Sequence, residues 1–341
     1  MRTVLRVVLL ILGIGLAVGV IRYHGLVFAV VSVVTRRVGS IDIFGTTGVD
    51  VEAVRAKLPI KVGDFSAKFH SGGPRRAEFE QATGHVPVNV FPVCCDERGR
   101  EFVFIGLGGR DVPTTQPPSG AERLSKPLLD LYNEFGFALI AAIMRGNSHE
   151  DHSTGYALSQ DPALRAIQLR MRDAALKNEQ ELFTVSANSG DINSRRAAVH
   201  LLGYAQRSKQ QAQTLASAAR DADENVRNNA TRALGVLINA FPETAKEIDL
   251  DYFLELMNSP VWTDRNKASM LLEEASRSRE PSILARIRAK DIDALTEMAR
   301  WKTPHRGTAV MILGRMGGME ESSLVDKAQH GRYEEILAAV H

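Results

Sequence analysis

The spacing of hydrophobic and polar positions divides the chain into three parts. Residues 7–21 form an unbroken apolar run, short alternating segments follow between residues 40 and 107, and from residue 121 apolar positions recur every three or four residues. Alternation with a period of two is typical of strands, and a period near 3.6 is typical of helices. The pattern therefore predicts an α+β multidomain chain that starts with a hydrophobic segment.

The start of the chain indicates export. Arg2 and Arg6 precede the apolar residues 7–21, and a second apolar run follows at 25–34. A basic start before an apolar stretch is typical of a signal peptide, but an uncleaved membrane anchor has the same pattern. The first run has 15 residues, fewer than the roughly 20 that span a bilayer. Both interpretations of residues 1–38 stay open, and we favour the anchor.

Residues 39–110 predict a small βααββ domain. The expected elements, in order, are a strand at 40–45, helices at 49–60 and 74–85, and strands at 86–93 and 100–107. Two helices on one face of a three-stranded sheet would bury the apolar side of each element. The strand that ends at Gly45, the Gly63-Asp64 pair after the first helix and the element order resemble a POTRA domain. That resemblance implies a bacterial envelope protein with a sheet edge available to a partner strand.

Residues 111–120, DVPTTQPPSG, have no period and are rich in Pro, Thr and Gly, which is typical of a linker. The strand pattern ends there. Residues 121–178 predict a helical connector or cap, in which Asp161 is the N-cap and Pro162 the first residue of a helix.

A repeated pattern dominates the rest of the chain, residues 179–341. Four segments begin with Arg, have Ala three residues later and continue with a Leu-Leu, Ala-Leu or Ile-Leu pair; the arginines are Arg195, Arg227, Arg265 and Arg306. They are spaced 32, 38 and 41 residues apart, and another helical stretch lies between successive copies. A two-helix unit that recurs at this spacing indicates an α-solenoid, in which stacking buries the apolar faces.

The copies also carry signals for where the second helix begins. Asp191 and Asp223 each stand four residues before their Arg and are expected N-caps. Thr263 is the expected cap in the third copy, and Thr303 with Pro304 starts the fourth. We interpret the repeat arginines as making local contacts at helix starts on a partly solvated face.

The pattern resembles HEAT repeats, in particular the short bacterial type found in phycobilisome-lyase-like proteins. Three copies have Gly after the apolar pair, whereas the third has Glu273. The resemblance implies a concave surface that binds other proteins. It also leaves an alternative open, a lyase-like or chromophore- or cofactor-handling protein.

Charge and composition argue against nucleic acid as a partner. The formal net charge is +2, and aromatic residues make up 6% of the chain. Nucleic-acid binders normally need a basic stripe or a stacking platform, and the sequence shows neither.

Two groups of residues could carry chemistry. His149 and His152 are weak candidates for metal ligands, but the surrounding residues 146–162 predict a solvated loop. Cys94 and Cys95, adjacent in a predicted strand, should point to opposite faces, so we expect no disulfide between them. We therefore predict no catalytic residue, no metal site and no cofactor.

These observations together predict a non-enzymatic protein-interaction scaffold of the bacterial cell envelope. It would be anchored in the inner membrane with periplasmic domains, or exported to the periplasm. Its expected partners are other envelope proteins, and the membrane itself if residues 1–38 are not cleaved.

Overall fold

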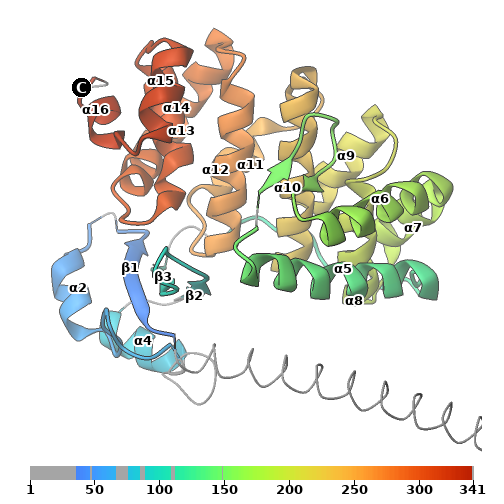
Figure 1. Ribbon diagram of the computed structural model, residues 1–341, viewed down its shortest axis with the longest axis horizontal. Helices are drawn as coiled ribbons and strands as arrows, with labels where there is room; N and C mark the ends of the chain where they lie inside the picture. Colours follow the sequence, from blue (N-terminus) through green and yellow to red (C-terminus); the bar gives the residue numbers. More distant parts are fainter. Residues whose placement is uncertain are drawn as a thin grey trace, which may run out of the picture. The chain divides into compact units, whose positions relative to one another are not determined.

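The computed structural model describes residues 36–46, 48–66, 76–84, 89–108, 112–147 and 149–339. The chain divides into two compact units, Met1–Leu107 and Gly108–His341. Figure 1 colours them from blue, at the start of the chain, to red. The hydrophobic run predicted to be a leader or anchor lies outside the described residues.

The first unit is a three-stranded sheet with two short helices. Its strands are β1 (Val38–Phe44), β2 (Asn89–Val93) and β3 (Glu101–Gly106), and its helices are α2 (Val51–Lys57) and α4 (Arg76–Thr83). The strand order is β1-β3-β2, with β1 parallel and β2 antiparallel to β3. This arrangement confirms the predicted order of elements and the mixed α+β character.

The apolar positions that predicted these elements form the core of the first unit. Ile41 and Ile43 of β1 lie opposite Val103 and Ile105 of β3. Val54 of α2 packs in the same cluster, in which the full set is Val38, Ile41, Ile43, Val54, Leu58, Ile60, Phe79, Val103, Ile105 and Leu107. The helix α2 begins at Val51, inside the expected range 49–60, because the Asp50 carboxylate accepts hydrogen bonds from the backbone amides of Glu52 and Ala53.

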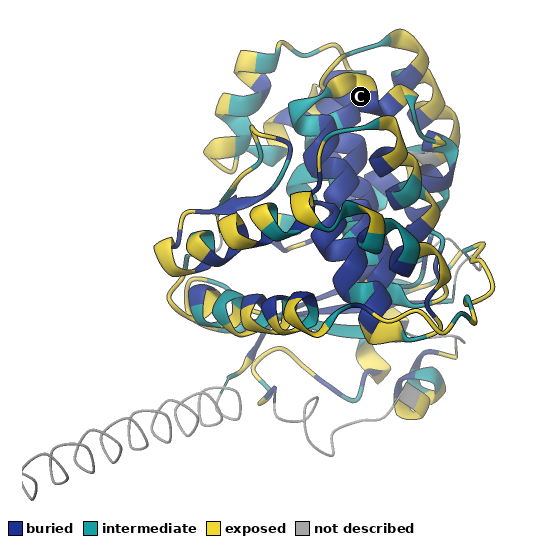
Figure 2. Ribbon diagram, turned by 90° about the vertical axis from the view of Figure 1, so that its right-hand side faces the viewer, coloured by how far each residue is buried: buried dark blue, intermediate teal, exposed yellow. Residues whose placement is uncertain are grey.

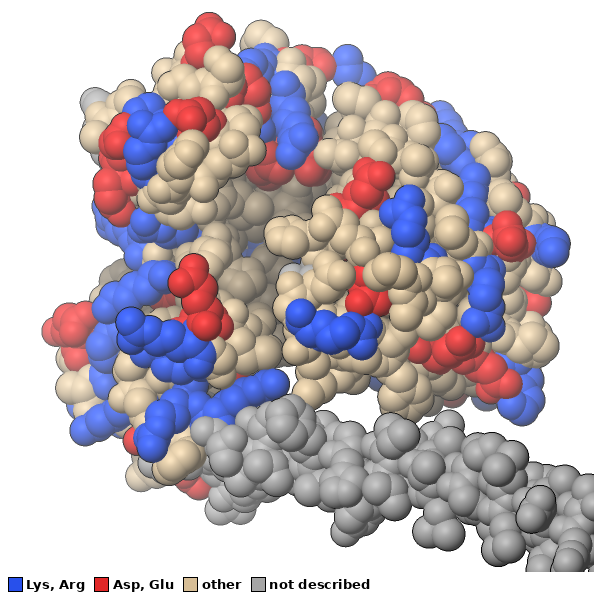
Figure 3. All heavy atoms as spheres, in the orientation of Figure 1, with Lys and Arg blue, Asp and Glu red and all other residues tan. Residues whose placement is uncertain are grey.

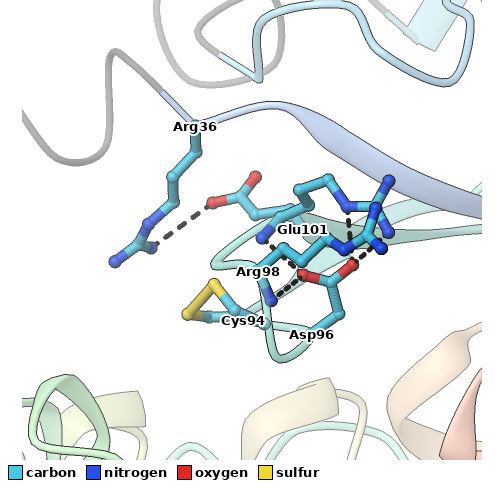
Figure 4. Close-up of a disulfide and its surroundings, with 7 residues drawn as sticks. Arg36, Cys94, Asp96, Arg98 and Glu101 are labelled. Carbon is cyan, nitrogen blue, oxygen red and sulfur yellow. Dashed lines mark hydrogen bonds and ion pairs between the residues drawn. A yellow bond between two sulfur atoms is a disulfide. The ribbon is translucent and has the colours of Figure 1, made fainter.

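The prediction for the two cysteines is wrong, because Cys94 and Cys95 form a disulfide (Figure 4). The strand β2 ends at Val93, so the alternation of a strand no longer governs their side chains. The peptide bond between them is cis and their Cα atoms are 3.2 Å apart. Next to them, the Asp96 carboxylate accepts hydrogen bonds from the backbone of Arg98 and Arg100 and closes the turn to β3.

The second unit is mainly helical. It starts with α5 (Lys126–Met144), a two-stranded hairpin of β4 (Glu150–Asp151) and β5 (Leu158–Ser159), and α6 (Pro162–Lys177). Four helix pairs follow: α7 (Glu179–Asn188) with α8 (Ile192–Leu202), α9 (Lys209–Ala218) with α10 (Glu224–Ala240), α11 (Leu250–Leu256) with α12 (Trp262–Ser276), and α13 (Pro281–Ala299) with α14 (Gly307–Met316). Two further helices, α15 (Glu321–Gln329) and α16 (Tyr333–Ala338), end the unit.

The four arginine-led segments lie side by side, as the repeat pattern predicts. The second helices α8, α10, α12 and α14 each contact the next one along the chain. The first helices contact each other on the opposite side, α7 with α9 and α11 with α13. The pairs therefore stack in two layers (Figure 1), and the apolar residues between the layers are buried, as the centre of the unit in Figure 2 shows.

The predicted helix starts are partly confirmed. Asp161, Asp191 and Asp223 are N-caps whose carboxylates accept hydrogen bonds from the first turn. Thr263 is not a cap, because α12 begins one residue before it, at Trp262, and its N-cap position is Val261. Thr303 stands before a short 3-10 turn (Pro304–Arg306), so α14 itself starts only at Gly307.

The segment predicted as a linker lies along the helical unit from residue 112 onwards. Thr115 donates its backbone amide to the carbonyl of Arg220, and Gly120 donates to that of Asn188. Ser189 donates its hydroxyl to the carbonyl of Glu122. The last carbonyls of a helix have no donor within the helix. Residues 112–125 supply donors to carbonyls at two helix ends and are therefore held in place.

Candidate functional site

Three repeat arginines connect the second helix of a pair to the turn that precedes it within the same pair. They donate to the backbone carbonyl six residues earlier, at 2.8 Å for Arg195 to Ser189, 3.0 Å for Arg227 to Asp221 and 2.8 Å for Arg265 to Ser259. This contact lies at the start of the second helix. Arg195, Arg227 and Arg265 thus make a local contact at the start of their helix.

Each repeat arginine also binds an acidic residue that comes later in the chain, either on a following helix or, for Arg195, in the turn between α9 and α10. Arg195 forms two hydrogen bonds with Asp221, and Arg227 forms two with Asp264; the single contacts are Arg265 with Glu297 at 2.6 Å and Arg306 with Glu334 at 2.9 Å. Two parallel bonds from one guanidinium give the strongest and most directional kind of ion pair. These pairs therefore fasten one helix pair to the next.

The prediction of a partly solvated face is wrong for three of the four arginines. Arg195, Arg227 and Arg265 are 1%, 6% and 3% exposed. Burial alone would lower the pKa of Arg227, but its hydrogen bonds with Asp264 and that residue's charge outweigh burial and raise it. These side chains are consequently structural and lie out of reach of a ligand.

The surface left open by the stack is a narrow stripe along the second helices. Helices α10, α12 and α14 are buried on nearly all sides, and their partly exposed positions recur every three or four residues. We call this surface the open stripe; it consists of Asn229, Arg232, Lys267, Met270, Glu274, Thr308 and Met311. Its regular spacing places these side chains on one face of each helix.

The stripe mixes apolar and charged groups. Glu274 accepts hydrogen bonds from Asn239 and pairs with Arg277 at 2.8 Å. Lys267 makes a weak contact with the sulfur of Met270 at 3.6 Å. Burial, helped by the positive charge of Arg232, lowers the pKa of Lys267 to about 8. The environment of Lys267 therefore disfavours its charged ammonium form. A carboxylate on a bound ligand would favour that form and so counter the effect of burial.

One end of the stripe is closed by α5 and the β4–β5 hairpin. The rings of Tyr132 and Phe135, both on α5, lie 5.3 Å and 4.5 Å from the ring of His200. Tyr156 of the hairpin lies 6.1 Å from Tyr204. These contacts cover α8, and burial lowers the pKa of His200 to about 3. The open stripe therefore begins at α10.

The segment predicted as a solvated loop is this hairpin, and it is bound to the repeats. Glu150 forms an ion pair with Arg232 of α10 and accepts a hydrogen bond from Gln168 of α6. Burial alone would raise the pKa of Glu150, but the charge of Arg232 and the hydrogen bonds with His152 and Arg232 together outweigh it and hold that pKa well below its usual value. The guanidinium of Arg232, which is partly exposed, thus attracts the carboxylate and fixes the hairpin against α10.

The structure does not bring the two candidate histidines together as ligands. His152 lies 3.6 Å from Glu150, whereas His149 is exposed and contributes its carbonyl to the hairpin. Within the described residues, no group of three His, Cys, Asp or Glu side chains could hold a metal ion. The sequence reasoning missed Arg232. Arg232 stands five residues after a repeat arginine, and the corresponding residues of the other copies are His200, Met270 and Met311. A charged residue at this one position was the feature that could have indicated it.

Charges on the helical unit are mixed. Over the face drawn in Figure 3, basic and acidic side chains alternate without a broad area of one sign. Many of them form ion pairs across neighbouring helices, such as Arg196 with Asp223 and Arg207 with Glu247.

Comparison with known proteins adds one finding about these helices. A family model described as HEAT repeats matches residues 180–273, which run from α7 into α12. No curated protein matches the chain.

Proposed function

We propose, from the HEAT repeats at residues 180–273, that this chain is a non-enzymatic protein-interaction scaffold of the bacterial cell envelope. The observation that carries the proposal is the open stripe, a continuous partly exposed surface on helices that are otherwise buried. Stacked helical repeats commonly present such a surface to other proteins. The stripe is accordingly the proposed binding surface.

The composition of the stripe suits a protein segment. Met270 and Met311 offer flexible apolar contacts that adapt to different side chains. Lys267, three residues before Met270 on the same helix, adds a hydrogen-bond donor. The buried arginine pairs keep the helices in register, so the partner would meet a surface that is already ordered.

The envelope part of the proposal comes from the first unit and from residues 1–38. A basic, apolar start would carry the chain to or across the inner membrane. The resemblance to a POTRA domain adds that β2, an edge strand of the sheet, would offer its backbone to a strand of a partner. Sequencing the N-terminus of the mature chain and fractionating the cells test this part separately.

Site-specific photo-crosslinking tests the stripe as a binding surface. The full chain would carry benzoylphenylalanine in place of Met270 or Met311. It would be expressed in the organism that naturally produces this protein, so that its natural partners are present. A matched control carries the same group at Gln213, which is exposed on α9 in the outer layer. We expect the two stripe positions to yield the same crosslinked partner band and position 213 to yield none.

A second variant tests whether the stripe contributes to binding of the partner or only lies close to it. Met270→Glu with Met311→Glu places two charges on the stripe and should reduce recovery of that partner at least about tenfold. The control Gln213→Glu should leave recovery unchanged. Equal recovery with both variants, at unchanged helical circular dichroism, would reject the stripe as the binding surface.

A further inference from the structure

A second surface of the helical unit is apolar and exposed. On α5, Phe137 is 77% exposed, Ile140 59% and Met144 44%, and on α6 Leu169 is 44% exposed. With Ile143 these side chains form what we call the apolar patch. Large apolar side chains that gather on a surface usually mark an interaction site, whereas single ones are normal.

The members of the patch belong to one surface. Phe137, Ile140 and Met144 are three and four residues apart, so they line one face of α5. Helix α6 lies beside α5, as Figure 1 shows, and both helices are joined by two hydrogen bonds between Glu134 and Arg170, at 2.7 and 2.9 Å. Leu169 stands next to Arg170 in the sequence of α6, and its side chain is exposed.

The opposite face of α5 already has its partners in the fold. Its buried residues, Leu128, Leu131, Phe135 and Ala142, pack in the unit, where α5 contacts α6 and α8. Among the described residues, α5 is the one helix long and apolar enough to cross a membrane, yet only 22% of its apolar stretch is buried in the unit. Because it packs against α6 and α8, it suits a position beside a bilayer and not across one.

The charges around the patch identify the kind of surface that fits it. No charged residue occurs between Phe135 and Met144, and Arg145 follows directly. The adjacent helix α6 carries four basic residues, Arg165, Arg170, Arg172 and Lys177, against the single acidic Asp173. Arg170 is paired with Glu134 of α5, and Arg172 donates to the carbonyls of Tyr204 and Ala205. Arg165 and Lys177 are thus the basic residues of α6 that suit a contact outside the unit. An apolar face beside a basic one is typical of helices that lie in the interface of an anionic bilayer.

We propose that the apolar patch rests in the interfacial region of an anionic membrane, with Arg165 and Lys177 of α6 at the level of the headgroups. The apolar run at residues 7–21 of the same chain supports this partner, because a membrane segment would hold the helical unit near a bilayer. This contact is separate from the open stripe, which lies on α10, α12 and α14.

A tryptophan placed in the patch tests the proposal in the full chain. Phe137→Trp adds a fluorophore at an exposed position, and the native Trp262 and Trp301 are buried and common to all variants. The matched control is Ile192→Trp, at an exposed apolar residue at the start of α8 that is not part of the patch. The protein would be reconstituted with vesicles of phosphatidylethanolamine and phosphatidylglycerol, with and without lipids brominated along the acyl chain.

We expect brominated lipid to remove about half of the emission that Phe137→Trp adds, and to leave the emission that Ile192→Trp adds nearly unchanged. Equal quenching in both variants, or none in Phe137→Trp, would overturn the proposal. A blue shift of the Phe137→Trp variant that appears without vesicles and grows with protein concentration would also overturn it, since the patch would then bind a second copy. Photo-crosslinking at the open stripe is unaffected by any of these outcomes.

Discussion

At the scale of single residues, the repeat arginines show how one residue type, at the same position of each repeat, stabilises the stacked helix pairs. Each of the first three donates to the backbone carbonyl six residues before it. Each also binds a carboxylate much further along the chain. Arg227 is the clearest case, because both oxygens of the buried Asp264 accept from its guanidinium. Losing one member of such a buried pair leaves the other charge without compensation.

The first prediction follows for Arg227. Arg227→Met should lower the free energy of unfolding of the helical unit by about 3–5 kcal/mol, because Asp264 would keep only the hydroxyl of Ser259. Urea unfolding followed by circular dichroism at 222 nm measures this change.

Arg306→Met is the matched control for that prediction. Its partner Glu334 is 79% exposed at the side chain, and an exposed pair contributes about 0–1 kcal/mol. If both substitutions lowered stability equally, the buried pairs would not be the fastening between repeats that the geometry indicates.

At the scale of elements, the distance between second helices depends on the residue after the apolar pair. A Cβ atom at Gly203 would lie 2.9 Å from the Cβ of Ala233 on α10, so this glycine permits the close approach of α8 and α10. In the third copy Glu273 takes the position, and its carboxylate binds the guanidinium of Arg315 on α14 at 2.8 Å. A charged side chain at this position is thus accommodated because the guanidinium of Arg315 pairs with it.

A pair of glycine substitutions tests this explanation. Gly203→Ala should destabilise the helical unit by about 1–3 kcal/mol, because the added methyl group overpacks the contact with Ala233. At Gly235 the nearest atom would be 3.6 Å away, an ordinary contact, so Gly235→Ala should be neutral or stabilise by up to about 1 kcal/mol. Thermal unfolding of the two variants measures the difference, and a larger loss for Gly235→Ala would contradict the account.

At the scale of the whole molecule, the helical unit is a linear array. Each pair contacts mainly its neighbours, and the last pair is covered by α15 and α16. Leu324 of α15 is fully buried and lies against Gly314 of α14. In such arrays stability is roughly a sum of the repeats and of the contacts between neighbours.

Weakening the C-terminal end of the array is therefore expected to lower protection against hydrogen exchange, and the loss should become smaller with distance from that end. Leu324→Ala removes buried contacts that are usually worth about 2–5 kcal/mol. Native-state hydrogen exchange should show the largest loss of protection in α13 and α14, a smaller one in α12 and almost none in α8. A uniform loss from α8 to α14 would indicate one cooperative block instead of an array.

The sequence alone determined the local features. The periods of the apolar positions predicted the order of strands and helices, and the four arginine-led segments predicted the stack. Asp161, Asp191 and Asp223 were predictable as caps because a cap acts within three residues of its own position. Thr263 was predicted as a cap in the same way, but α12 starts at Trp262, two residues before the start that this cap would give.

Only the tertiary structure decided which distant groups meet. The carbonyl partner of a repeat arginine lies six residues away in three copies, whereas the acidic partners lie 26, 37, 32 and 28 residues away, a spacing with no period to detect. The same holds for Glu150 and Arg232, which are 82 residues apart. Local hydrogen bonds and periodic burial are encoded over a few residues, but the open stripe and the apolar patch exist only because packing covers some faces of these helices and leaves others uncovered.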